Sequence, residues 1–257
     1  MANETGIWTV NLLDINVFAM SMNNVLDLCE KTIEQRSSLL IGVLNVAKAV
    51  NSRKDNRLRK SLDDADIVVA DGRGIIWLSK LVGKPLPERV AGIDIMCKLF
   101  ERASEKKYRV YFLGAKQHVV EKVVNYVGDN HPGLVVAGYH DGYFDDSSEK
   151  EVADDIRDSK ADILFVAVPS PKKENFLSKW REYMNVPVCH GVGGSFDVVA
   201  GVTKRAPLWM QKYGLEWFYR VMQEPGRMWK RYLVTNSVFA GLALKETILA
   251  RLGIAKP

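Results

Sequence analysis

Short apolar runs alternate along this chain with longer segments in which apolar residues recur every three to four positions. The run Ile163–Val168 is apolar at every position, which is typical of a parallel strand covered by helices on both faces. The same reasoning predicts six strands, at Leu39–Leu44, Ile67–Ala70, Arg109–Leu113, Leu134–Tyr139, Ile163–Val168 and Val186–His190. Helices are predicted near residues 21–35, 46–61, 73–81, 92–106, 117–130, 148–158 and 172–184.

This alternation predicts an α/β fold, with a Rossmann-like, mostly parallel sheet and helices on both of its faces. An amphipathic segment at Trp8–Leu13 is expected to add an edge strand. After residue 203 the strand signals stop, and the sequence becomes helical, basic and rich in aromatic residues. We therefore predict two parts, an α/β domain over residues 1–203 that carries the chemistry and a helical appendage over residues 204–257.

Charge is divided unevenly between these two parts. The whole chain of 257 residues has a net charge of +5, yet residues 204–257 account for +7 and residues 1–203 for −2. Three tryptophans lie among the basic residues between Arg205 and Arg231. Amphipathic aromatic rings beside Arg and Lys suit a lipid–water boundary or an anionic ligand. The appendage is therefore expected to meet membrane lipid, phosphate or nucleic acid.

The longest uncharged stretch of the appendage, Tyr232–Leu244, has thirteen residues, whereas about 20 are needed to cross a bilayer as a helix. If the protein contacts a membrane, we expect it to lie on the surface. No signal peptide is expected, because no basic start followed by an apolar run is present. Cys29, Cys97 and Cys189 are far apart and mostly in apolar surroundings, which indicates reduced thiols and a cytoplasmic location.

Ligands of open α/β sheets bind at the carboxyl ends of the strands, so the residues that follow each predicted strand are candidates for a site. Gly191, Gly193 and Gly194 follow the last predicted strand, and their amides could hold a diphosphate or serve only a tight turn. Asp197 could bind a base or ribose, or cap the turn. This segment matches neither a Walker loop nor the full Gly-x-Gly-x-x-Gly of a nicotinamide site.

Asp71 directly follows the second predicted strand, where a carboxylate can take a proton from an attacking hydroxyl as a general base. The alternative is an aspartate that caps the next helix. Arg89 could bind phosphate through its planar guanidinium, and Asp94 could cap a helix or contact a ligand hydroxyl. The four histidines lack metal-ligand spacing and Asp64-Ala-Asp66 precedes its strand, so no metal site is expected.

A series of short motifs occurs in a fixed order along the chain. The motifs are Asn45, Asp71-Gly-x-Gly74, Arg89-Val-x-Gly-x-Asp94, Gly142-Tyr-Phe144, Pro171-Lys-Lys-Glu174, Gly191-Val-Gly-Gly-x-Phe-Asp197, Arg205-Ala-Pro207, Leu215-Glu-Trp-x-x-Arg220 and Glu224-Pro-x-Arg227. Each is short, but the ordered series resembles the WecG/TagA/CpsF family of bacterial glycosyltransferases, glycosyltransferase family 26. The resemblance covers about residues 8–235, nearly the whole chain.

The resemblance implies an inverting, metal-independent enzyme without a cofactor, cytoplasmic and peripheral at the inner face of the cell membrane. Such an enzyme moves a hexose-type sugar from a UDP-sugar to a polyprenyl-diphosphate-linked saccharide, in surface or exopolysaccharide synthesis. The roles implied are Asp71 as general base, Asn45, Arg89 and Tyr143 toward the sugar or acceptor, Lys173 and Asp197 near the nucleotide, and Arg220 and Arg227 over the diphosphate. Asp94 and the three glycines named above complete the candidate set.

Two positions depart from the pattern that the family usually shows. Lys173 stands where Gln is common, and its charge could suit a uronate donor or contact phosphate. Val43 stands where Thr is common, which removes a hydroxyl that could have bound substrate. The donor sugar therefore stays open among glucose, N-acetylmannosamine and N-acetylmannosaminuronate.

Two other interpretations of the basic appendage remain. A nucleotide-binding regulatory or nucleic-acid-binding protein would use it for phosphate contacts that weaken with salt. A homo-oligomer would use it as a subunit interface, where aromatic residues and Arg are enriched. The Asp71 segment and the clustered tryptophans favour the enzyme, so no nucleic-acid partner is expected.

Overall fold

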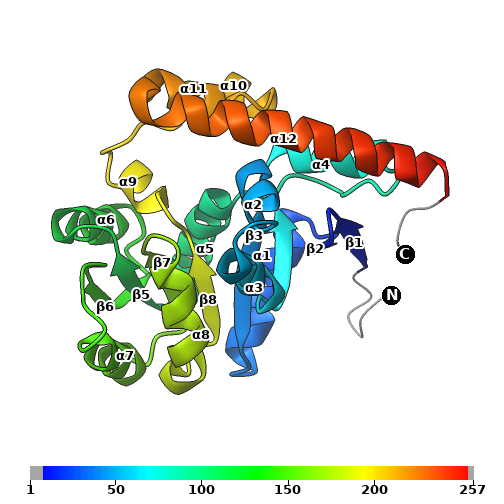
Figure 1. Ribbon diagram of the computed structural model, residues 1–257. Helices are drawn as coiled ribbons and strands as arrows, with labels where there is room; N and C mark the ends of the chain where they lie inside the picture. The colour runs from blue at the N-terminus through cyan, green and yellow to red at the C-terminus, as the bar shows by residue number, and fades with distance from the viewer. Residues whose placement is uncertain (1–7, 254–257) are drawn as a thin grey trace.

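A six-stranded sheet, parallel throughout, forms the centre of the computed structural model, which describes residues 8–253 apart from the side chain of Arg227 (Figure 1). The strand order is β4-β3-β8-β7-β5-β6. The strands are β3 (Leu39–Leu44), β4 (Ile67–Ala70), β5 (Arg109–Gly114), β6 (Val135–His140), β7 (Ile163–Ala167) and β8 (Val188–Gly191). Each lies within two residues of its predicted position, so the parallel α/β fold is confirmed.

Helices cover both faces of the sheet because successive side chains of each strand point to opposite sides. In β5, Val110 and Phe112 face one core, whereas Tyr111 and Leu113 face another. The first core is shared with α1 (Met22–Glu34), α5 (Gly92–Lys106) and α6 (Gln117–Asn130). The second is shared with α7 (Glu149–Asp158) and α8 (Lys172–Met184).

The N-terminal segment differs from its prediction. Thr9–Leu12 (β1) pairs antiparallel with Ile15–Phe18 (β2) in a separate two-stranded sheet and does not extend the main sheet. Leu13 and Asp14 connect the two strands with φ values of 53° and 65°, the left-handed backbone that a tight hairpin turn requires. A local turn therefore pairs the segment with its own continuation.

The predicted helix over residues 46–61 is two helices, α2 (Val46–Asn51) and α3 (Asn56–Asp63). Asp55 interrupts the periodic pattern, because its carboxylate accepts the backbone N–H groups of Arg57 and Leu58 and starts a new helix. The break orients α2 toward the carboxyl edge of the sheet.

The C-terminal appendage forms α10 (Leu208–Lys212), α11 (Glu216–Gln223) and α12 (Pro225–Arg251), after the short α9 (Ser195–Val199). The long helix α12 lies across α2 and α4 (Arg73–Leu81), above the carboxyl edge of the sheet (Figure 1). A third apolar core lies between the β1–β2 hairpin, β4 and α4. Phe239, Leu242 and Ala243 of α12 pack on this core. Gly74 of α4 leaves room for α2, because a Cβ there would lie 2.6 Å from Cγ2 of Val46, whereas the ring of Phe239 would be 3.4 Å away.

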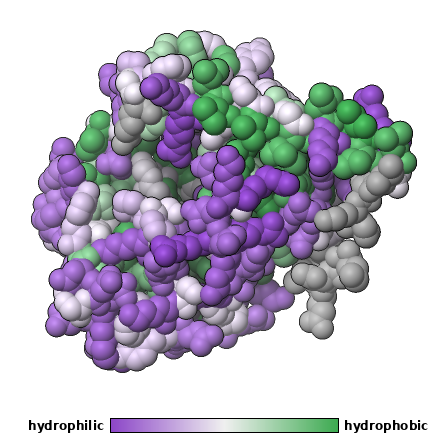
Figure 2. Space-filling model, viewed as in Figure 1, coloured by the Kyte–Doolittle hydropathy of each residue, from purple (hydrophilic) through white to green (hydrophobic). Residues whose placement is uncertain are grey.

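The other side of α12 is apolar and exposed. It carries Trp229, Leu233, Val234, Val238, Leu244 and Ile248. Figure 2 shows hydrophobic residues gathered over α12 and α4, while the lower part of this face is mostly hydrophilic. By length and composition Met228–Arg251 could cross a bilayer, so the count of thirteen uncharged residues understated the apolar length. Here the helix lies along the body of the protein.

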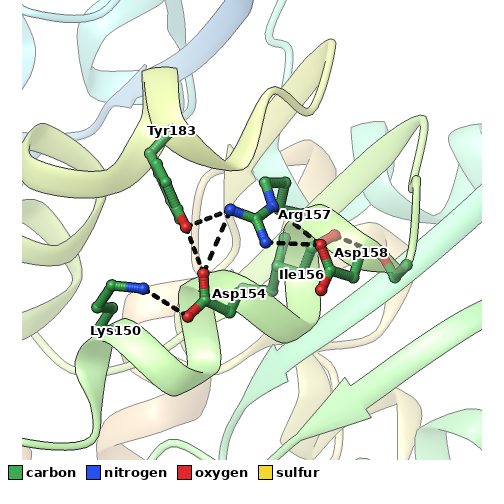
Figure 3. Close-up of polar contacts among 7 residues, drawn as sticks. Lys150, Asp154, Ile156, Arg157, Asp158 and Tyr183 are labelled. Atoms are coloured by element: carbon green, nitrogen blue, oxygen red, sulfur yellow. Dashed lines mark hydrogen bonds and ion pairs between the residues drawn. The ribbon is translucent and has the colours of Figure 1, made fainter.

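A polar network far from the carboxyl edge of β4 links α7 to α8 (Figure 3). Tyr183 of α8 donates its hydroxyl to Asp154, and Arg157 contacts both of these residues. Lys150 pairs with Asp154 at 2.7 Å, and Arg157 pairs with Asp158 at 2.9 Å. All the members are partly exposed to solvent or fully so, and we assign the network a structural role.

Candidate active site

Asp71 extends β4 at the carboxyl edge of the sheet, where its backbone N–H donates to the carbonyl oxygen of Leu44 at 2.8 Å. Helix α4 begins after Gly72, and no side chain caps its described N-terminus. The alternative interpretation of Asp71 as a helix cap is therefore wrong. Its carboxylate is left available at the position where ligands of α/β sheets bind.

The surroundings of Asp71 make its carboxylate unusually basic. The pKa of Asp71 is raised from 3.8 to about 6, mainly because its side chain is largely buried, at 23% exposed, and partly because Glu216 is nearby. The cations Arg89, Lys48 and Arg220 act in the opposite direction. A carboxylate with a pKa near 6 is ionised at neutral pH and still basic enough to accept a proton in a transition state.

Arg89 reaches Asp71 because the next residue, Val90, donates its N–H to the carbonyl oxygen of Ala70 at the end of β4. Nη2 of Arg89 lies 3.9 Å from Oδ1 of Asp71 and 2.6 Å from Oε2 of Glu216. Nε of Arg89 is buried without a hydrogen-bond partner among the described residues. The guanidinium thus joins the sheet edge to α11 and keeps a spare donor for a ligand.

Asp94 also contacts the appendage. It lies in the first turn of α5, whose N-cap is Ala91, and its Oδ1 is 2.7 Å from Nη1 of Arg205. Its side chain does not cap α5, and its predicted contact with a ligand hydroxyl stays a prediction. The predicted ligand residues Arg89 and Asp94 therefore each bind a charged residue of the appendage, and these two partners were not identified from the sequence.

Asn45 lines a hollow of about 520 Å³ between α2, α8 and α12. Its Oδ1 caps α2 by accepting the N–H of Lys48 at 3.0 Å. Nζ of Lys48 donates to the carbonyl oxygen of Val43, and burial together with the nearby Lys173 lowers its pKa to about 8. The other lining residues are Ala47, Asn51, Lys54, Asp55, Leu58, Ser170, Glu174 and Arg231. Lys48 was missed in the sequence because one lysine on a helix carries no signal of its own.

Lys173 borders the same hollow and lies over Gly191 at the end of β8. A Cβ at Gly191 would be 2.9 Å from Cδ of Lys173, so the glycine makes room for the lysine. Nζ of Lys173 pairs with Oε1 of Glu174 at 3.0 Å. Because β8 is the neighbour of β3, this lysine lies near Lys48 and Asn45.

The rest of the glycine segment forms a turn into α9. Gly193 is exposed with a φ of 53°, and Gly194 precedes Ser195 as the N-cap of α9. The backbone carbonyl of Asp197 accepts the N–H groups of Val202 and Thr203. The side chain of Asp197 is half-buried. The tight-turn role is thus visible, and a diphosphate role for the amides stays a prediction.

Tyr143 lies away from this cluster. It follows β6, the opposite edge strand from β4, which places it roughly 24 Å from Asp71 at the usual strand spacing. Its side chain is 71% exposed. Lys172 holds this loop in place by donating to the carbonyl oxygens of Gly142 and Phe144. The structure does not bring Tyr143 to Asp71.

The two arginines predicted to lie over the diphosphate are on the appendage. Arg220 is exposed on α11, one turn after Glu216, and is close enough to lower the pKa of Asp71. Arg227 lies in the first turn of α12, but its side chain is outside the described part of the structure. Arg220 is therefore the appendage cation that the structure brings to the base.

Within residues 8–253, no group of three or more His, Cys, Asp or Glu side chains is arranged to hold a metal ion. Asp66 lies at the amino edge of the sheet, where it accepts the N–H of Leu40 and pairs with Arg181. Asp66 thus lies at the edge of the sheet opposite to the candidate site, as the position of Asp64-Ala-Asp66 before its strand indicated. At the carboxyl edge, lysines and arginines provide positive charge beside the hollow.

The fold and the site together define a class of protein. A parallel α/β sheet carries, at its carboxyl edge, one basic carboxylate, several cations and a hollow large enough for part of a nucleotide or sugar. A site with these groups suits an enzyme that acts on an anionic substrate, with the carboxylate as base and the cations binding negative charge.

The chain belongs to the glycosyl transferase WecG/TagA/CpsF family, whose model matches residues 10–252. It is 40% identical over 201 residues to the N-acetylglucosaminyldiphosphoundecaprenol N-acetyl-beta-D-mannosaminyltransferase of Bacillus spizizenii, covering 78% of this chain and 77% of the relative. It is 36% identical over 227 residues to the protein of the same name from Bacillus subtilis, covering 88% and 87%. The family resemblance is confirmed, and the regulatory or nucleic-acid-binding alternative gains no support.

Proposed function

We propose that this glycosyltransferase is an inverting, metal-independent enzyme that moves a hexose-type sugar from a UDP-sugar to a saccharide on a polyprenyl-diphosphate carrier. The names of the two Bacillus relatives support a lipid-linked N-acetylglucosamine acceptor and an N-acetylmannosamine unit as the transferred sugar. Residues 1–203 would form the catalytic domain, and residues 204–257 the membrane-associating appendage. The observation that carries the proposal is the carboxylate of Asp71 at the sheet edge, which has a raised pKa and does not cap α4.

In the proposed reaction, Asp71 accepts the proton of the acceptor hydroxyl. The hydroxyl oxygen forms a bond to the anomeric carbon as the bond from that carbon to the diphosphate oxygen breaks on the opposite face. UDP leaves with the bonding electron pair, and the configuration at the anomeric carbon is inverted. Arg220 and the cations near the hollow would stabilise the negative charge that develops on the diphosphate.

The appendage would bring this site to the inner face of the membrane. The exposed side of α12 is apolar over much of its length, which is unfavourable in water and favourable against lipid. Each Lys or Arg near an anionic surface adds about 1 kcal/mol to such binding. The ion pairs Arg205–Asp94 and Arg89–Glu216 join the appendage to the catalytic domain. An appendage bound to lipid would therefore hold the site close to the membrane surface.

The pH dependence of transfer should report Asp71. Because the base must be ionised, kcat/KM is expected to fall about tenfold per pH unit below a midpoint near pH 6 and to level off above it. Steady-state rates between pH 4.5 and 8, at fixed ionic strength, measure this fall of kcat/KM. A flat profile through pH 6 would exclude Asp71 as the group whose ionisation limits the reaction.

The space at Gly191 should affect the affinity for the UDP-sugar donor, because it fixes the position of Lys173. In Gly191→Ala the new methyl group displaces the end of a flexible side chain, so the donor KM is expected to rise several-fold with little loss of thermal stability. The matched control is Gly128→Ala on α6, where a Cβ meets nothing within 4 Å. Calorimetric titration with UDP measures both variants. Equal UDP affinity in the two would show that the position of Lys173 is irrelevant to the nucleotide.

A donor screen tests the function itself. Full-length protein is incubated with a polyprenyl-diphosphate-linked N-acetylglucosamine and one of three UDP-sugars, carrying N-acetylmannosamine, glucose or N-acetylmannosaminuronate. Mass spectrometry of the lipid product then shows whether one sugar residue has been added. Transfer from one donor is expected, and no product from any donor would refute the proposed function.

A further inference from the structure

Glu216 is an acidic residue of the appendage that contacts Arg89, the arginine beside the base. It is the first residue of α11, and its Oε2 lies 2.6 Å from Nη2 of Arg89. The same nitrogen is 3.9 Å from Oδ1 of Asp71. One guanidinium nitrogen therefore lies between two carboxylates, in close contact with Glu216 and at a distance from Asp71.

The competition between the two carboxylates matters because Asp71 needs a free oxygen. A full ion pair with Arg89 would occupy the carboxylate lone pairs that must take the acceptor proton, and it would also stabilise the ionised form. Both effects would make Asp71 a weaker base. A carboxylate that holds the guanidinium from the other side prevents this.

The remaining charges around Asp71 cannot replace Glu216. Lys48 of α2 and Arg220 of α11 also face the carboxylate, and both are cations that stabilise its ionised form. Glu216 opposes these cations, because its negative charge raises the pKa of Asp71. The effect of Arg89 on the base thus depends on a residue of the appendage.

We propose that Glu216 is a positioning residue that holds Arg89 away from Asp71, so that the base is competent only while α11 is docked on the catalytic domain. The proposal rests on the proposed function for its catalytic consequence and on the geometry alone for its effect on Asp71. It gives the Leu215-Glu-Trp segment a role besides membrane contact.

The test is Glu216→Gln in the full chain, with Glu182→Gln as the control. Glu182 is an exposed residue of α8, whose C-terminal part lies at the amino edge of the sheet with Arg181 and Asp66. Carbon-13 NMR titration follows the Asp71 carboxyl, which is assigned by its absence in Asp71→Asn. In Glu216→Gln its midpoint should fall clearly below 6, and kcat should fall roughly tenfold at an unchanged affinity for UDP. Glu182→Gln should match the wild type.

A second variant separates positioning from a simple charge effect. If Glu216 acts through Arg89, then Glu216→Gln should have a much smaller effect when Arg89→Gln is already present. Equal effects in the two backgrounds, or an unchanged midpoint in the single variant, would overturn the proposal. The titration needs no turnover, so a shifted midpoint in a protein that transfers no sugar would refute the proposed function and leave this inference standing.

Discussion

Replacement of Asp71 by Asn is expected to lower kcat for sugar transfer by about 10²–10⁴-fold, the usual contribution of a general base. The affinity for UDP should change little, because the amide keeps the shape of the side chain and the cations remain. Arg89 loses a carboxylate only at 3.9 Å and retains Glu216 at 2.6 Å. Initial rates and calorimetric titration with UDP measure the two quantities separately.

The same substitution should stabilise the fold. A pKa of about 6 in the folded protein, against an ordinary value of 3.8, means that the folded state binds the proton more tightly than the unfolded state. Stability therefore falls as the pH rises from 3.8 to 6, and ionised Asp71 costs on the order of 1–3 kcal/mol above that range. Asn, which cannot ionise, should raise the melting temperature at pH 7.5 and have little effect at pH 4.

Asp146→Asn is the control, because Asp146 is an exposed loop residue distant in sequence from the site. It should change neither the rate nor the pH dependence of stability. Wild-type kcat in Asp71→Asn would exclude the base assignment. A lower melting temperature at pH 7.5 would show that the ionised carboxylate is better satisfied in the folded protein than its environment indicates.

Membrane binding should be lost when charge is placed on the exposed side of α12. Leu233 and Val238 are 59% and 40% exposed, so glutamates at both positions can be accommodated without disturbing the packed side of the helix. Removing two apolar side chains from lipid and adding two negative charges should weaken binding to anionic vesicles at least about tenfold. Vesicle sedimentation measures the bound fraction, and circular dichroism confirms the fold.

Val135→Glu is the matched control, since Val135 is 37% exposed at the start of β6, at the amino end of the opposite edge strand. It should sediment as the wild type does. If the double variant also sediments normally, α12 is not the membrane contact. If instead it loses self-association in analytical ultracentrifugation, the exposed side is a subunit interface.

Much of the architecture could be predicted because most strands of the main sheet are buried on both faces. Runs such as Ile163–Val168 cannot be amphipathic, and their alternation with helices leaves few arrangements of the chain. The positions of Asp71 and Asn45 at the carboxyl edge followed from the same pattern. The strand order, by contrast, depends on contacts between distant segments that local periodicity does not encode.

The appendage contacts could not be predicted for a similar reason. Glu216 and Arg205 are ordinary charged residues of a basic segment, and their partners Arg89 and Asp94 lie more than 100 positions earlier in the chain. The ligand roles predicted for Arg89 and Asp94 stay predictions, but their ion pairs with the appendage had no signal in the sequence. Similarly, Tyr143 shares the carboxyl edge with Asp71, but the sequence did not show that opposite edge strands separate them.

The central claim is that Asp71 is the base for sugar transfer to a lipid-linked acceptor. Its most direct test is acceptor-dependent UDP release on one vesicle preparation. The wild type and Asp71→Asn are compared at concentrations that give equal occupancy by the UDP-sugar donor. We expect the wild type to release one UDP for each sugar added, and the variant to release it at least about a hundredfold more slowly. Equal rates in the two proteins, or UDP release independent of the acceptor, would contradict the account.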